Sequence, residues 1–238
     1  MKTKGPLLLA CNHPNSFLDG VILNTLFDQP LYSLARGDVF KKPFYIKLLT
    51  LLNLLPVYRI SEGAENLSIN YDTFNTCKNI FLQKGIVIIF SEGKCINEWH
   101  LRPLKKGPAR LAVMSWNENI PLKVLPVGIN YSSFRRFGKN MFINFGEMIE
   151  KKDIESTHPE GIRYQAFNTI LEQQLKQLVF EIDKKDKEKQ ERLLLRKPSA
   201  LKKILLFLPA LIGFITHCPL YLPVKSFTFK RTNHNDHY

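Results

Sequence analysis

Residues 86–93 read Ile-Val-Ile-Ile-Phe-Ser-Glu-Gly, an apolar run followed by a polar turn. The continuous β-branched and apolar run of residues 86–90 is typical of a central strand that is buried on both faces of a parallel sheet. The acid and the glycine that follow predict a turn at the carboxyl end of this strand. In open α/β sheets, binding and catalytic sites lie at that end. The segment therefore indicates both a fold class and the edge of the sheet at which a site is expected.

Short apolar runs alternate with helical patterns along most of the chain, which is typical of α/β proteins. Residues 65–84 carry apolar side chains at steps of three and four and precede Gly85, so they predict a helix with a glycine cap. The other elements are predicted as strands at residues 7–11, 31–35, 122–129 and 141–145 and as helices at 17–27, 108–116 and, mainly, 159–196. Pro126 indicates an edge strand or a strand end. The expected fold is a mixed, largely parallel central sheet flanked by helices.

Length and composition exclude several classes of protein. A chain of 238 residues and 27.6 kDa fits one α/β domain with an appendage. Its 45% hydrophobic and 23% charged residues exclude global disorder, and its 12 Gly and 14 Pro show no repeat. The four cysteines form no Cys-x-x-Cys pair, so neither a disulfide framework nor a zinc knuckle is indicated and a reducing compartment is expected.

The charge balance predicts a polyanionic partner. Thirty-four Lys and Arg against 21 Asp and Glu give a net charge of +13, which attracts nucleic acid, anionic lipid headgroups or a phosphorylated substrate. Zinc-finger spacing, a ribonucleoprotein box and heptads after a basic region are all missing, which disfavours nucleic acid. The apolar segments of the chain favour lipid.

Two apolar segments are candidates for membrane contact. Residues 44–57 contain Lys47 as their single charge and six leucines, so this segment is either deeply buried or lies against lipid, and it is too short to span a bilayer. Residues 204–224 carry no formal charge and are flanked by lysines. Three prolines in the latter segment favour an interfacial or re-entrant segment over a regular transmembrane helix, and the alternative is a hydrophobic hairpin packed on the domain.

The domain organisation follows from this change in composition. We expect an α/β domain at residues 1–196 and a hydrophobic, basic-flanked, membrane-associating tail at residues 197–238. No secretory signal is visible, because the apolar run of residues 7–10 is too brief for a signal helix.

Residues 12–19, Asn-His-Pro-Asn-Ser-Phe-Leu-Asp, contain a candidate catalytic pair. The strand at 7–11 brings His13 to a carboxyl strand end, and Pro14 places His13 in a turn. Asp19 falls in the first turn of the next helix, from where its carboxylate can point back to the imidazole. A carboxylate that orients a histidine is typical of a general base. The alternative is structural, since Ser16 and Asp19 also have the spacing of a helix-capping box.

A candidate anion site follows the strand at 86–90. Backbone amides around Gly93 and the Lys94 ammonium suit a phosphate group. Arg59 and the Lys105-Lys106 pair add positive charge. Taken singly, each of these cations is typical of an ordinary surface residue, so the prediction depends on their occurring together.

These motifs resemble those of glycerolipid acyltransferases of the 1-acylglycerol-3-phosphate acyltransferase (PlsC) family, over about residues 5–150. Four blocks occur in the family's order, namely residues 12–19 as the histidine–aspartate motif, residues 53–59 ending in Arg, Phe90-Ser91-Glu92-Gly93 in place of Phe-Pro-Glu-Gly-Thr-Arg, and Leu125-Pro126-Val127. The segment 104–107 is also family-like.

The sequence departs from the family pattern at three places. Five residues, rather than four, separate His13 from Asp19, so the turn must be looped differently. Ser91 stands where the family has Pro, and Lys94-Cys95 stands where it has Thr-Arg. Lys94, Arg102 or Lys105 would have to replace the missing phosphate-binding Arg. The family's usual N-terminal membrane helix or helix pair is not seen in the sequence.

The resemblance implies transfer of an acyl group from acyl-CoA or acyl carrier protein to a hydroxyl of a glycerol phosphate or lysophospholipid, at the cytoplasmic face of the cell membrane. In that reaction His13 is the base, Asp19 orients it, and no covalent acyl-enzyme, cofactor or metal is needed. Gly93 amides hold the oxyanion, Glu92 has a positioning role, and the acceptor phosphate is bound by Arg59, Lys94 and Lys105. The rival interpretation is a non-catalytic peripheral protein that binds anionic membranes. Nucleic acid is not expected as a partner, and the terminal pair His234 and His237 is at most a weak cation site.

Overall fold

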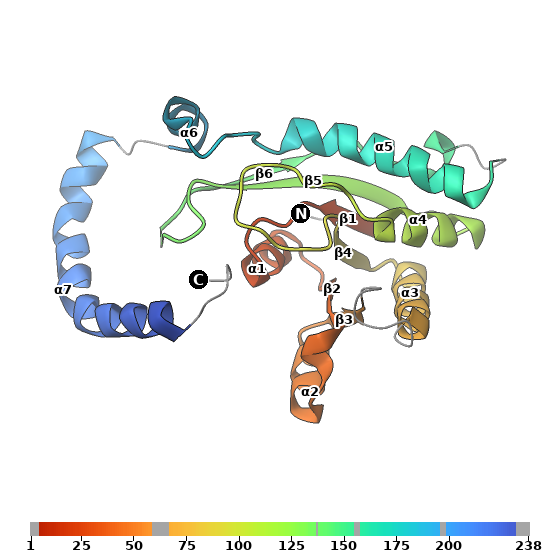
Figure 1. The fold of residues 1–238 in the computed structure, drawn as a ribbon, viewed down its shortest axis with the longest axis horizontal. Helices are drawn as coiled ribbons and strands as arrows, with labels where there is room; N and C mark the ends of the chain where they lie inside the picture. The colour runs from red at the N-terminus through yellow and green to blue at the C-terminus, as the bar shows by residue number, and fades with distance from the viewer. Residues whose placement is uncertain (1–4, 59–66, 137, 155–157, 196–198, 232–238) are drawn as a thin grey trace. The chain divides into compact units, whose positions relative to one another are not determined.

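The computed structural model describes residues 5–58, 67–136, 138–154, 158–195 and 199–231. In this part of the chain, six strands form one sheet in the order β3-β2-β4-β1-β5-β6 (Figure 1). The strands are β1 (Leu7–Cys11), β2 (Leu31–Arg36), β3 (Leu54–Val57), β4 (Ile86–Phe90), β5 (Lys123–Tyr131) and β6 (Met141–Phe145). The pairs among β1 to β5 are parallel. The Ser132 N–H donates to the Asn140 carbonyl, and the Gly146 N–H donates to the Pro126 carbonyl. The pairing thus advances along one segment as it goes back along the other, so β6 is antiparallel to β5. The sheet is mixed and largely parallel, as predicted.

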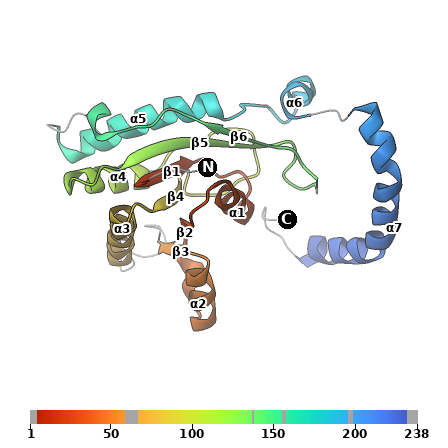
Figure 2. The same ribbon diagram turned by 180° about the vertical axis from the view of Figure 1, so that it is seen from behind.

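The strand β4 is central, as the apolar run predicts, because it lies between β2 and β1. Helices α3 (Leu67–Leu82), α4 (Gly107–Asn117) and α5 (Glu160–Leu178) contribute to one buried core with alternate residues of β1 and β4. Figures 1 and 2 show α4 and α5 side by side along the sheet, and these two helices pack on each other. Helix α1 (Phe17–Leu26) buries Asp19 and Leu23.

Pro126 does not mark an edge, and that expectation is wrong. It is the fourth residue of β5, a strand that lies between β1 and β6. Its carbonyl accepts a hydrogen bond from Gly146 N–H at 2.9 Å. Since N–H and C=O of one strand residue point to the same side, the missing N–H would face Gly146, one residue past the end of β6. The proline therefore costs the sheet no bond within β6.

The apolar segment 44–57 is not one unit. It divides into α2 (Pro43–Leu51) and β3, with Asn53 between them at φ 57°. No residue of α2 is buried, which excludes the deeply buried alternative for this helix. The predicted long helix after Pro159 also divides, into α5 and α6 (Lys187–Leu194), and Asp186 caps α6 by accepting from Lys189 N–H at 2.9 Å.

The apolar tail forms a helix, α7 (Ala200–Arg231), which continues through Pro209, Pro219 and Pro223. The expectation that the prolines interrupt the helix, and the alternative of a hairpin, are both wrong. The helix bends in Figure 1, as expected where prolines remove hydrogen bonds to the preceding turn. Residues 200–228 are long and apolar enough to cross a membrane. Their most apolar 18-residue stretch has a mean hydropathy of 1.9, and none of it is buried.

Packing divides the chain into two compact units. One comprises Met1–Asn130 and Phe142–Asp183, and the other comprises Tyr131–Met141 and Lys184–Tyr238. The predicted functional division into a domain at 1–196 and a membrane-associating tail at 197–238 stays a prediction. All described candidate site residues belong to the first unit.

Candidate active site

His13 and Asp19 are in contact, as predicted. Nδ1 of His13 lies 2.9 Å from Oδ2 of Asp19. The aspartate side chain is fully buried, and the histidine side chain is 17% exposed. A regular helix would place residues six positions apart on different faces, but Ser16 has φ 48° and ψ −132° and reverses the chain just before α1. This turn accommodates the five-residue gap between the two side chains.

The capping-box interpretation is not supported by the hydrogen bonds at the start of α1. Ser16 is the N-cap residue, yet its side chain makes no cap hydrogen bond. Its N–H donates instead to Sγ of Cys95 at 3.0 Å. Oδ2 of Asp19 accepts from the N–H of Asn15 at 2.8 Å in addition to its contact with His13. Because a carboxylate only accepts, this arrangement favours a proton on Nδ1 of His13 and leaves Nε2 to accept one.

Glu92 links the two strand ends. One carboxylate oxygen accepts from the N–H of His13 at 2.9 Å, and the other accepts from the N–H of Arg102, also at 2.9 Å. The residue is 5% exposed. Burial raises the pKa of the Glu92 carboxyl, although the two backbone donors oppose this increase. The acid therefore fixes the backbone of the histidine turn.

The ends of β1 and β4 lie side by side, which brings the two motifs together. Cys11 pairs with Phe90, and Ser91 N–H donates to the Cys11 carbonyl at 2.7 Å. The Phe90 ring stacks on the His13 ring at 3.8 Å between centroids and 16° between planes. Ile96 N–H closes the arrangement by donating to the His13 carbonyl at 3.3 Å.

The candidate cations differ in how the structure places them. Gly93 adopts φ +64°, and a Cβ there would lie 3.0 Å from Cγ of Lys105, so the Lys105 stem packs on this turn. Lys105 N–H also donates to the Ser91 carbonyl at 2.8 Å. Lys94 is in the turn and exposed. The Arg102 guanidinium pairs with Glu98 at 2.9 Å, which makes it a poor replacement for the family's Arg. Arg59, like His234 and His237, lies outside the described residues.

Sequence reasoning missed three polar features of the site. The side-chain amide of Asn15 is fully buried, and neither of its polar atoms has a partner among the described residues. The same holds for Oγ of Ser91. The third feature is the contact between Cys95 and the start of α1. In the sequence, Ser91 and Cys95 are visible only as departures from the family motif. The burial of Asn15 and Ser91 and the contact of Cys95 depend on how the turn folds, which the sequence does not show.

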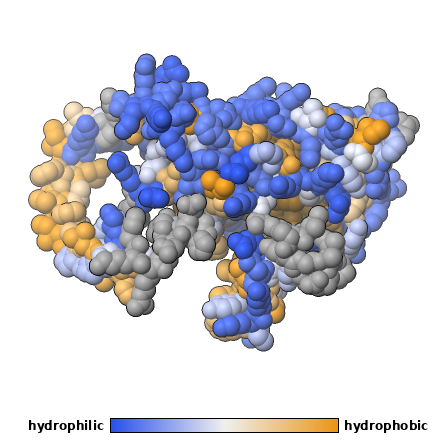
Figure 3. Space-filling view, viewed as in Figure 1, coloured by the Kyte–Doolittle hydropathy of each residue, from blue (hydrophilic) through white to orange (hydrophobic). Residues whose placement is uncertain are grey.

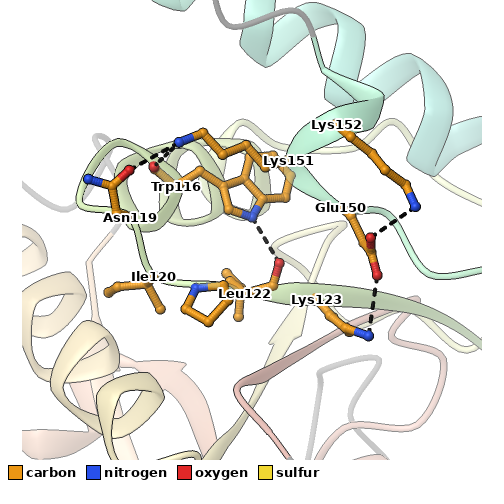
Figure 4. A pocket seen from close by; sticks show the side chains of 9 residues that line it. Trp116, Asn119, Ile120, Leu122, Lys123, Glu150, Lys151 and Lys152 are labelled. Atoms are coloured by element: carbon orange, nitrogen blue, oxygen red, sulfur yellow. Dashed lines mark hydrogen bonds and ion pairs between the residues drawn. The ribbon is translucent and has the colours of Figure 1, made fainter.

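A separate open groove of about 480 Å³ (Figure 4) lies at the amino ends of β1 and β5, away from the candidate site. It is lined by Trp116, Asn119, Ile120, Pro121, Leu122, Lys123, Glu150, Lys151 and Lys152. Lys123 opens β5 and pairs with Leu7 at the start of β1, whereas His13 follows the end of β1. Glu150 forms ion pairs with Lys123 at 3.3 Å and with Lys152 at 3.1 Å, and the Lys151 ammonium donates to the Trp116 carbonyl at 2.9 Å. We assign the groove no part in the candidate site.

Comparison with known proteins places this geometry in a family. The crystal structure of the 1-acyl-sn-glycerophosphate (LPA) acyltransferase, PlsC, from Thermotoga maritima is similar in fold, with a TM-score of 0.51 and 17% sequence identity over 83% of this chain and 70% of that chain. No curated protein matches the sequence. The family model described as Acyltransferase matches residues 1–130, which include β1, β4 and the whole His13–Glu92 arrangement. The chain belongs to the acyltransferase family.

Proposed function

We propose that the protein transfers a fatty acyl group from a thioester, acyl-CoA or acyl carrier protein, to a hydroxyl of a glycerol phosphate or lysophospholipid, with His13 as the general base. The observation that carries the proposal is the 2.9 Å contact between Nδ1 of His13 and the buried carboxylate of Asp19. A partly exposed imidazole held by a buried carboxyl group is suited to remove a proton from a bound hydroxyl.

The reaction needs no enzyme nucleophile. Nε2 of His13 takes the hydroxyl proton as the oxygen attacks the thioester carbonyl and forms the new C–O bond. The tetrahedral intermediate then collapses and the C–S bond breaks. His13 gives its proton to the leaving thiolate, which departs as the thiol. Asp19 stabilises the imidazolium between these steps. We assign stabilisation of the oxyanion to backbone amides near Gly93, where the Gly93 N–H itself donates to the Phe90 carbonyl at 3.1 Å.

The acceptor phosphate is assigned to the positive charges around the same turn. Lys105 is the strongest candidate, because its stem packs on Gly93. Lys94, in the same turn, belongs to the proposed set, and Arg59 is included from the family resemblance alone because it lies outside the described residues. A phosphate bound here would hold the attached glycerol near the end of β1, where the base lies, and ordered placement of two reactants accounts for much of the rate gain of such enzymes.

We also propose that the protein acts at the cytoplasmic face of a membrane. The long, unburied apolar helix α7 supports membrane association, and the net charge of +13 favours an anionic surface. The same features would suit a non-catalytic lipid-surface protein, so the decisive evidence has to be chemical.

An acceptor panel with one radiolabelled acyl donor tests this proposal. Purified full-length protein is incubated with labelled acyl-CoA or acyl carrier protein and, in turn, glycerol 3-phosphate, lysophosphatidate and other lysolipids. Label in an esterified lipid product identifies the acceptor and the donor. Membrane binding without any labelled product, from either donor, would favour the non-catalytic alternative and overturn the proposal.

A further inference from the structure

The helix α2 is apolar around most of its circumference and is exposed. Its sequence is Pro-Phe-Tyr-Ile-Lys-Leu-Leu-Thr-Leu, it has no buried residue, and Phe44 and Leu51 are 73% and 79% exposed. Its contacts are with the neighbouring 3-10 turn η1 (Gly37–Phe40) and with β3. Figures 1 and 2 show α2 projecting beyond β3, and Figure 3 shows apolar surface on it. A helix of this composition needs an apolar environment that covers it.

The charges around α2 indicate what that environment is. Lys41 and Lys42 precede the helix and Lys47 lies on it, and all three are exposed. No acidic residue occurs from residue 39 to residue 58. Apolar side chains next to lysines match the two layers of an anionic membrane surface, acyl chains below and phosphates above. At nine residues the helix is too short to cross a bilayer, so it fits shallow insertion.

The start of α2 lies at the same edge of the sheet as the candidate site, whereas its C-terminal end leads to Leu54, the first residue of β3. The turn η1 follows the carboxyl end of β2, which is parallel to β4, and β4 is parallel to β1. His13 and Glu92 follow β1 and β4 at this same edge. Two further exposed apolar residues lie at this edge, Val39 in η1 at 45% and Phe17 at the start of α1 at 66%.

We propose that α2 inserts into the surface of an anionic lipid bilayer and holds the His13 edge of the sheet against it. The inference rests on the proposed function in one respect, the lipid nature of the acceptor. With α2 inserted, a lysophospholipid presents its glycerol hydroxyl to His13 while its acyl chain stays in the bilayer. The insertion of α2 is separate from that of α7 and is tested by a probe on α2 itself.

Tryptophan reporters on α2 and α3 test the insertion directly. Phe44→Trp on α2 is compared with Tyr71→Trp on α3, where the side chain is 55% exposed, and both retain the native Trp99 and Trp116 as a common background. The full chain is added to vesicles of phosphatidylcholine and phosphatidylglycerol with brominated acyl chains. We expect a blue shift and quenching for Phe44→Trp only. Equal quenching in both variants, or none for Phe44→Trp, would overturn the proposal.

The same reporter distinguishes other occupants of α2. Without vesicles, the emission of Phe44→Trp should not change with protein concentration. A blue shift that grows with concentration, together with dimers in sedimentation, would indicate that a second copy covers α2. That result would overturn the bilayer assignment.

Kinetics separate failure of this inference from failure of the proposed function. The double variant Phe44→Ser/Leu51→Ser should raise KM for vesicle-borne lysophosphatidate about tenfold, because this acceptor reaches the site from lipid. KM for glycerol 3-phosphate, which reaches the site from solution, should not change. Tyr71→Ser/Leu82→Ser on α3 is the matched control, because both side chains are more than half exposed. An active wild type whose two KM values are unaffected by the α2 variant would contradict the inference while the acyl transfer stands. A wild type inactive on every acceptor would refute the function, and the tryptophan result would still decide the role of α2.

Discussion

The backbone N–H of His13 donates to Oε2 of Glu92 at 2.9 Å, while the other oxygen of the same carboxylate accepts from Arg102. The acid of the second motif thus holds the turn that carries the base of the first. Such a buried carboxylate acts on the reaction through the position of His13, and this distinguishes it from the surface acids of the chain.

Replacing Glu92 by Gln should lower kcat by about tenfold to a hundredfold with little change in acceptor KM. An amide offers one acceptor and one donor, so either His13 N–H or Arg102 N–H would lose its partner. Steady-state kinetics on the acceptor that the panel identifies would measure the effect. Glu98→Gln, which removes an acid paired with the Arg102 side chain, is the control. A rise in KM at constant kcat would show that Glu92 binds substrate directly and does not position the base.

The raised pKa of Glu92 predicts a pH-dependent stability. Burial raises the pKa of the Glu92 carboxyl above its usual value of 4.5 in the folded state. The folded protein therefore holds the proton more tightly than the unfolded chain. Its contribution is fully present below the unfolded pKa and is lost as the pH rises through the folded pKa. Urea unfolding should therefore give a difference in free energy, wild type minus Glu92→Gln, that decreases from about pH 4.5 towards neutrality. A difference that increases over this range would indicate a lowered pKa.

Thiol reagents should modify Cys95 and spare the core cysteines. Burial raises the pKa of the Cys77 thiol to about 12 and also raises that of Cys11, so neither forms a thiolate at neutral pH. Cys95 is partly exposed and contacts the turn that carries His13. Alkylation should inhibit acyl transfer, as followed by peptide mass spectrometry and activity. Cys95→Ser should resist inhibition, whereas Cys218→Ser should remain as sensitive as the wild type.

Lys105→Ala should raise KM for a phosphate-bearing acceptor about tenfold, as expected for loss of a charged hydrogen bond. The lysine packs on Gly93 and has an exposed charge. Lys176→Ala, which removes an exposed lysine on α5 paired with Glu172, is the control and should leave KM unchanged. Equal KM values for the wild type and Lys105→Ala would exclude Lys105 from phosphate binding.

The sequence predicts most of the fold because strand and helix patterns here are local. The runs at Leu7–Cys11 and Ile86–Phe90 are apolar throughout, and their positions inside the sheet follow from that composition. Local rules fail at the prolines. Pro126 is tolerated because the partner strand ends opposite it, and the prolines of α7 are tolerated inside a helix. The outcome at Pro126 depends on a partner segment about twenty residues away in the sequence.

The candidate site is predicted only in part for a similar reason. His13, Asp19 and Glu92 are found by motif, since two parallel strands must end at the same edge. The reversal at Ser16, the stacking of Phe90 and the buried Asn15 depend on how the loop folds, and composition does not specify it. The exposure of α2 is also invisible in its sequence, because leucine-rich segments are equally typical of a core.

Single-turnover acyl transfer by His13→Ala tests the central claim most directly. The comparison variant is His100→Ala, which removes an exposed histidine that also contacts a carboxylate, Glu181, at 2.7 Å. With circular dichroism and vesicle binding unchanged in both, we predict that His13→Ala loses about a hundredfold to ten-thousandfold in rate and that His100→Ala retains the wild-type rate. Undiminished transfer by His13→Ala would contradict the account.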